Sequence, residues 1–283
     1  MNSLKKPLLW TIALAPLFLN QPVSAHVIWF EKINDNQHEI IFGHPEENKP
    51  EPLDIEKFQS ATAYDENHKV IPSTTSLENG RLFLKTNSPA SALTAFYDNG
   101  FWRENPDETY DNISQEEAEA INYENVSQFV KYAKSLSAWN ESLAQPFNLP
   151  IEIMPLENPL NLEAGDNLPI QVLFAENIVD APLVEYLGET INVNSNGTAI
   201  IPIGESGLEV IEASYTDLNS NNPEISYAAT FSAQSNSVPA IPEPQNLGLF
   251  ASITFFGLAQ TLKGLRLKKR MKTNKFDTVS FDK

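Results

Sequence analysis

The feature that most constrains this chain is a long succession of short apolar runs separated by turn-forming residues. Many of the runs alternate apolar and polar side chains or are rich in aromatic and β-branched residues, which is the pattern of β-strands. In the first half they occupy residues 27–30, 38–42, 61–64, 68–71, 81–84 and 92–97. The turn formers Asp65-Glu66-Asn67 and Asp98-Asn99-Gly100 lie between or after these runs. We therefore predict a β-rich N-terminal unit over residues 26–145.

The second half repeats the β pattern. A proline-bordered linker, residues 146–159, runs into six short runs at roughly ten-residue spacing, and Asn196-Gly197 marks a tight hairpin. The runs occupy residues 151–153, 168–174, 190–193, 198–203, 208–215 and 225–231. Regularly spaced short strands with turn signals are typical of a β-sandwich. We predict an immunoglobulin- or transthyretin-like β-sandwich over residues 146–235, so the fold class is mainly β.

One segment of the N-terminal unit has a different period. Ser114 followed by Glu117 forms a capping-box pattern, the signature of a helix start. Apolar residues then recur at helical spacing up to Trp139, at Val126, Phe129, Val130, Ala133 and Leu136. The pattern predicts a single amphipathic helix that covers one face of the sheet. Its polar face is acidic, which disfavours a membrane-surface helix.

The N-terminus has the pattern of a secretory signal. Lys5 and Lys6 precede an apolar run over residues 8–19, and small residues follow at Val23 and Ala25. We predict a signal peptide over residues 1–25 that is cleaved after Ala25. Cleavage there makes His26 the first residue, with a free α-amino group beside its imidazole.

The C-terminus has three predicted parts. Residues 236–246 form a proline-rich spacer, residues 247–267 a single transmembrane helix, and residues 268–283 a basic tail. The apolar span approaches the length that crosses a bilayer, and basic residues after a span favour the cytoplasmic side. The prediction is a single-pass protein of the cell membrane, with its body in the periplasm or outside the cell.

Composition narrows the possible ligands. Residues 26–242 contain 9 Lys and Arg against 34 Asp and Glu, and the whole chain has no cysteine. A body this acidic argues against nucleic acid, because phosphate binding needs clustered Lys and Arg. It would attract cations, although the ordinary interpretation of such charge is solubility of an extracytoplasmic protein. Without thiols, a metal site has to be built from nitrogen and oxygen ligands. No nucleophile motif stands out, so an enzyme of this sequence would have to be metal-based; our prediction is that the protein is not an enzyme.

Two of the four histidines are candidates for a metal site. His38 and His68 have the ordinary interpretation of structural or exposed residues, whereas His44 lies in a Gly-His-Pro turn. Together, His26 and His44 offer one amine and two imidazoles, a set suited to nickel, cobalt or copper. The oxygen ligands that could join them are Glu31, Glu46 and Asp98.

Five motifs in a fixed order resemble a known family. They are residues 25–31 (AHVIWFE), 42–45 (FGHP), 94–102 (TAFYDNGFW), 131–134 (KYAK) and 150–159 (PIEIMPLENP). Together they resemble the periplasmic domain family linked to NikM-type nickel transport complexes, otherwise described as of unknown function. The Pro-Glu-Pro sequence, apolar span and basic cluster of the tail resemble PEP-CTERM sorting tails. The first resemblance implies delivery of nickel or cobalt to an energy-coupling-factor importer, with His26 and His44 at the positions of the family's histidines.

The leading hypothesis is therefore a membrane-anchored periplasmic accessory protein that binds nickel or cobalt and contacts importer subunits. An alternative is a cell-envelope or matrix module that binds polysaccharide or protein and is sorted by its tail. A third hypothesis is a copper enzyme with an N-terminal histidine brace. Metal affinity of the mature N-terminus distinguishes the first hypothesis from the second.

Overall fold

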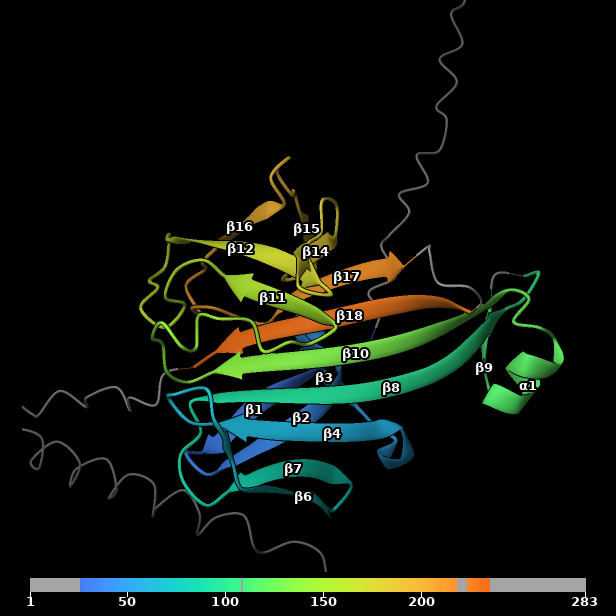
Figure 1. Cartoon of the computed structure of the whole chain (residues 1–283), viewed down its shortest axis with the longest axis horizontal. Helices are drawn as coiled ribbons and strands as arrows, with labels where there is room; N and C mark the ends of the chain where they lie inside the picture. The colour runs from blue at the N-terminus through green and yellow to red at the C-terminus, as the bar shows by residue number, and fades with distance from the viewer. Residues whose placement is uncertain (1–25, 108, 218–222, 235–283) are drawn as a thin grey trace, which may run out of the picture. The chain divides into compact units, whose positions relative to one another are not determined.

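The computed structural model describes residues 26–107, 109–217 and 223–234 (Figure 1). This part of the chain is mainly β, as the sequence predicts. The predicted signal, spacer, transmembrane span and basic tail lie outside the described residues. Among the residues described, none of the helices has the length and apolar character needed to cross a membrane.

A nine-stranded sheet forms the centre of the fold. Its strand order is β15-β14-β17-β18-β10-β8-β4-β5, with β9 paired to β8. The pairing of β10 with β18 is parallel, and the other pairings are antiparallel. The strands are β4 (Phe58–Tyr64), β5 (Val70–Ile71), β8 (Ala92–Glu104), β9 (Tyr110–Ile113), β10 (Val126–Leu136), β14 (Leu183–Tyr186), β15 (Glu189–Ile191), β17 (Ile211–Asp217) and β18 (Glu224–Ala233).

Two smaller sheets pack against this central sheet. The five-stranded sheet contains β1 (Val27–Asn34), β2 (Gln37–His44), β3 (Lys49–Glu51), β6 (Ser73–Glu78) and β7 (Arg81–Thr86). The four-stranded sheet contains β11 (Ile151–Pro155), β12 (Asn167–Phe174), β13 (Asn177–Ile178) and β16 (Thr198–Pro202). The helical elements are the short 3₁₀ turns η1 (Pro45–Glu47) and η2 (Ile55–Lys57) and the helix α1 (Gln115–Ala120).

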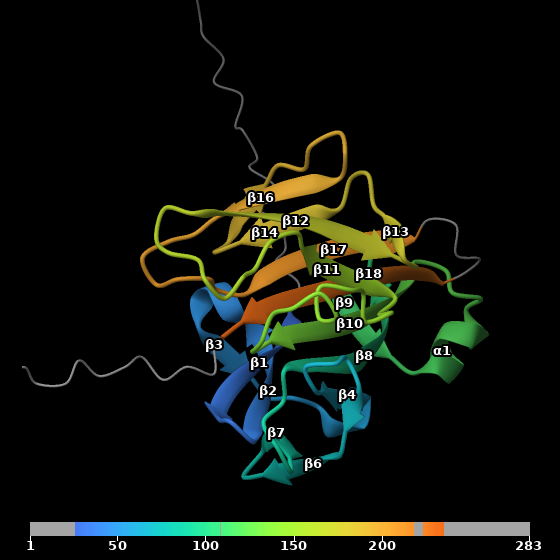
Figure 2. The same cartoon turned by 60° about the vertical axis from the view of Figure 1, so that its left-hand side comes forward.

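Both faces of the central sheet are buried in its middle strands. Val130 and Tyr132 of β10 belong to the core shared with the four-stranded sheet. Ala133, on the same strand, belongs to the core shared with the five-stranded sheet. In Figure 2 the central strands accordingly lie between β12 and β16 above and β6 and β7 below. The buried apolar residues run from Val27 to Ala233, so residues 26–236 contain every core described here.

The prediction of an amphipathic helix from Ser114 to Trp139 is wrong over most of that range. Only Gln115–Ala120 is helical, capped by Ser114 and Glu117 in the predicted capping box. Asn122, Tyr123 and Asn125 then take positive φ values, which ends the helix. Residues 126–136 form β10, a central strand. A strand buried on both faces loses strict polar alternation, and its apolar residues can then match helical spacing by chance.

The two predicted domains share a sheet. Strands β8 and β10 come from the range 26–145, whereas β14, β17 and β18 come from the range 146–235, and all five lie in the nine-stranded sheet (Figure 1). The parallel pairing of β10 with β18 joins the two ranges along ten residue pairs. The second range does form facing sheets, as a β-sandwich requires.

His38 is a buried residue with a testable effect on acid stability. It lies on β2 with 5% exposure, and its Nδ1 atom has no hydrogen-bond partner among the described residues. Burial, aided by the nearby Lys32 charge, lowers the pKa of His38 to about 4 from 6.5. The stability from neutral His38 is therefore present above pH 6.5 and lost as pH falls through 6.5 towards 4.

We expect the variant His38→Leu to lose less stability on acidification than the wild type. The expected difference between pH 7 and pH 4 is on the order of 3 kcal/mol. Denaturant titrations of both proteins at these two pH values measure it. An equal loss in both proteins would contradict the assignment.

Candidate metal centre

The antiparallel pairing of β1, β2 and β3 brings His26, His44 and Glu51 together. His26 immediately precedes β1, and Val27 pairs with Gly43, the residue before His44. Glu51 pairs with Phe42 in the register of β2 with β3. Three residues spread over the first part of the chain therefore meet at one end of the five-stranded sheet.

The close approach of β3 to β2 depends on Gly43. Gly43 has a φ of +142°, and a Cβ atom at this position would lie 2.4 Å from the carbonyl oxygen of Lys49. Any other residue would clash with backbone atoms there. The close approach explains why a glycine precedes His44 in the Gly-His-Pro turn. After this turn the η1 segment reverses the chain, and β3 places Glu51 beside the two histidines.

The three side chains are arranged as metal ligands could be. His26, His44 and Glu51 each offer a ligand atom, and these atoms all lie within 4.8 Å of one another. His26 Nε2 lies 2.8 Å from Glu51 Oε2, and the imidazole centroids of His26 and His44 are 4.4 Å apart. Phe42 stacks on the His26 ring at 5.2 Å with an interplanar angle of 4°. Two imidazoles and one carboxylate form a nitrogen–oxygen set that suits first-row transition metals.

Two buried polar atoms beside this cluster lack hydrogen bonds. His44 Nδ1 and Glu46 Oε2 have no hydrogen-bond partner among the described residues. His44 Nδ1 does lie 3.3 Å from Glu46 Oε1, so a carboxylate flanks the ring. Buried polar atoms are usually paired, and an unpaired one costs about 1–3 kcal/mol. His44 has a carboxylate beside its Nδ1 atom, as metal-ligating histidines usually do.

A second group of charges lies behind Glu46. Glu185 of β14 and Glu212 of β17 lie opposite each other on adjacent antiparallel strands of the central sheet. Burial, followed by the charges of Glu46 and Glu185, raises the pKa of Glu212 to about 8. Burial also lowers the pKa of Lys131, on β10, to about 8, although the Glu212 charge opposes the shift. The interior next to His44 is therefore rich in carboxyl groups.

The other candidate ligands from the sequence do not belong to the cluster of His26, His44 and Glu51. Glu31 is an exposed residue of β1, and Asp98 accepts hydrogen bonds from Gly100 N at 2.9 Å and from Gln128 Nε2 at 3.1 Å. His68 packs its ring 3.9 Å from that of Phe147. Glu46 lies beside His44 but outside the three-residue cluster. Glu51 completes that cluster, and its place in an acidic, proline-containing loop gave no signal of its own in the sequence.

Fold and site together define a layered β protein with a partly exposed cluster of two histidines and a glutamate. Comparison with family models places the chain in a known family. The chain belongs to the family described as Domain of unknown function (DUF4198), whose model matches residues 23–217. Searches against curated proteins and against solved structures gave no match.

Proposed function

We propose that this protein binds a divalent transition-metal ion at His26, His44 and Glu51 as cargo. The observation that carries the proposal is the convergence of these three ligand atoms within 4.8 Å. The carboxylate of Glu46, 3.3 Å from His44 Nδ1, supports it, because a ligating histidine usually has a carboxylate beside its other ring nitrogen. The side chains of His26 and Glu51 are 41% and 29% exposed, which allows an ion to enter and leave.

The ligand set favours nickel, cobalt or copper. Imidazole nitrogen binds these ions well, and the affinity of nitrogen–oxygen sites rises from cobalt through nickel to copper. If the signal is removed after Ala25, the α-amino group of His26 adds a third nitrogen. The chain has no thiol to add a soft ligand.

Delivery to a membrane importer is the role we propose for the bound ion. The resemblance of the five sequence motifs to the periplasmic domain family linked to NikM-type nickel transport complexes is what supports this role. The predicted signal, transmembrane span and PEP-CTERM-like tail support a body held outside the cytoplasmic membrane. On this proposal the partners are the membrane and importer subunits, and nickel or cobalt is the cargo.

Calorimetric titration of residues 26–236 tests the proposal. We expect Ni²⁺, Co²⁺ or Cu²⁺ to bind with micromolar affinity or better, and His44→Ala to weaken binding by more than about 100-fold. That exceeds the 10–100-fold loss typical of an outer-shell partner. Fe²⁺ belongs in the series, because sites of two imidazoles and one carboxylate also bind it.

Two matched controls make the titration specific. Glu47→Gln alters an exposed glutamate of η1 and should leave affinity unchanged, whereas Glu51→Gln should weaken it. One extra alanine ahead of His26 tests whether the free amine is a ligand. No affinity tighter than millimolar, or equal affinity in wild type and His44→Ala, would contradict the proposal and favour the envelope module.

A further inference from the structure

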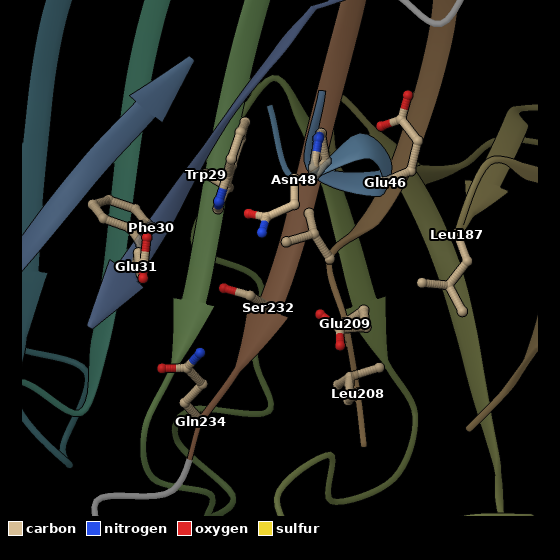
Figure 3. A pocket seen from close by; sticks show the side chains of 12 residues that line it. Trp29, Phe30, Glu31, Glu46, Asn48, Leu187, Leu208, Glu209, Ser232 and Gln234 are labelled. Carbon is tan, nitrogen blue, oxygen red and sulfur yellow. The ribbon is translucent and has the colours of Figure 1, made fainter. Parts of the chain in front are cut away.

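A second site lies next to the candidate metal centre. A cavity of about 410 Å³ opens between β1, the η1 turn, the segment before β17 and the end of β18 (Figure 3). The polar and aromatic side chains of its walls and mouth include Trp29, Glu46, Asn48, Glu209, Ser232 and Gln234. This volume accommodates a small organic molecule. None of the ligands of the candidate metal centre lines it.

Several polar groups of the cavity have no protein partner. Trp29 and Ser232 are more than nine-tenths buried, at 8% and 7% exposure. Among the described residues, neither side chain makes a hydrogen bond, and the same is true of the side chains of Asn48 and Gln234. Figure 3 shows the polar ends of these side chains turned towards a common space. Asn48 and Gln234 are exposed to solvent, so the buried group that can accept a hydrogen bond from a bound molecule is the Ser232 hydroxyl, while Trp29 offers its ring face.

The charge of the cavity selects the kind of molecule. Glu31, Glu46 and Glu209 contribute three carboxylates, and none of the described lining residues is a lysine, arginine or histidine. The indole of Trp29 adds an aromatic face, which attracts a cation through its ring quadrupole. Leu187, Leu208 and Val210 supply apolar wall for a short hydrocarbon chain.

We propose that this cavity binds a small organic cation, of the class of alkyl amines and diamines. The ammonium group meets the carboxylates and the indole, and the alkyl part lies against the leucine and valine side chains. The proposal adds a ligand to the metal ion proposed above. It does not depend on metal binding, because no ligand of the candidate metal centre is needed.

Titration of 1,4-diaminobutane into ¹⁵N-labelled, chelator-treated residues 26–236 tests the proposal. Three indole N–H signals arise from Trp29, Trp102 and Trp139, and Trp29→Phe identifies the first. We expect the Trp29 signal to shift saturably with one-to-one stoichiometry while the other two stay in place. Butan-1-ol and butyrate, of similar length but neutral or negative, should leave the Trp29 signal unmoved.

Glu209→Gln and Glu205→Gln form a matched pair of variants. Both glutamates are exposed, but only Glu209 lines the cavity. We expect Glu209→Gln to weaken amine binding about fivefold, a modest loss because the carboxylate is solvated, and Glu205→Gln to have no effect. Equal effects of the two variants, shifts of all three indole signals without saturation, or stronger binding of butyrate would overturn the proposal. Glu51→Gln, which alters a proposed metal ligand outside the cavity lining, should keep amine affinity, so failure of metal binding is distinguishable from failure here.

Discussion

Replacing Lys134 with methionine is expected to lower the free energy of unfolding by about 3–5 kcal/mol. Lys134 on β10 donates a 2.7 Å hydrogen bond to Glu152 Oε1 on β11, and both side chains are 1% exposed. The lysine also lies over the rings of Phe147 and Phe231. Removing it leaves the carboxyl group of Glu152 buried without its cation, which explains the large cost.

Denaturant titration of residues 26–236 measures this loss, and two further variants interpret it. The double variant Lys134→Met/Glu152→Gln removes both charges and retains an acceptor for the backbone N–H of Phe147, which now bonds to Glu152. It should recover much of the stability, because a neutral pair avoids the unpaired buried charge. Lys85→Met breaks the exposed pair with Glu78 and should cost less than about 1 kcal/mol. A loss below about 1 kcal/mol for Lys134→Met would contradict a buried, bonded pair.

The sequence predicted the β class and most strand positions, because many strands have one solvated face. It failed at β10, whose residues contribute to buried cores on both faces. Lys131 and Lys134 of this strand are each only 2% exposed. Their charges indicated surface positions in the sequence, but both residues lie in the interior. Glu152, which pairs with Lys134, and Glu212, whose charge acts on Lys131, lie on other strands, and one-dimensional patterning contains no information about such contacts.

The candidate site was predicted in part for a comparable reason. His26 and His44 flank two strands that the sequence predicts one after the other, and the antiparallel register of β1 with β2 brings the histidines together. Glu51 reaches them only because Gly43 lets β3 approach β2 closely. Glu185 and Glu212 come from the distant end of the chain, through the joining of two sequence ranges in one sheet. Contacts of this kind depend on tertiary packing, which overrides local propensity.

Glu212 should make the protein less stable as pH rises. Its folded-state pKa of about 8 lies above the ordinary value of 4.5, so between these values the folded state binds more protons than the unfolded state. The stability that protonated Glu212 contributes is therefore fully present below pH 4.5 and lost as pH rises through 8. Glu212→Gln keeps a neutral side chain of similar shape and does not titrate.

We expect Glu212→Gln to match the wild type near pH 5 and to be more stable near pH 8 by about 2–4 kcal/mol. The difference between the two proteins isolates Glu212, because His38 and the surface carboxylates titrate alike in both. Denaturant titrations at pH 5, 6.5 and 8 without metal ions measure it, and the exposed Glu189→Gln serves as control. The pKa of Lys131 is lowered to about 8, so above pH 8 the loss of its proton raises stability and opposes the effect of Glu212. The comparison of the two proteins is therefore limited to pH 5–8. A difference that stays constant from pH 5 to 8 would show that Glu212 is ionised throughout, and that the carboxyl groups behind His44 do not share a buried, repulsive environment.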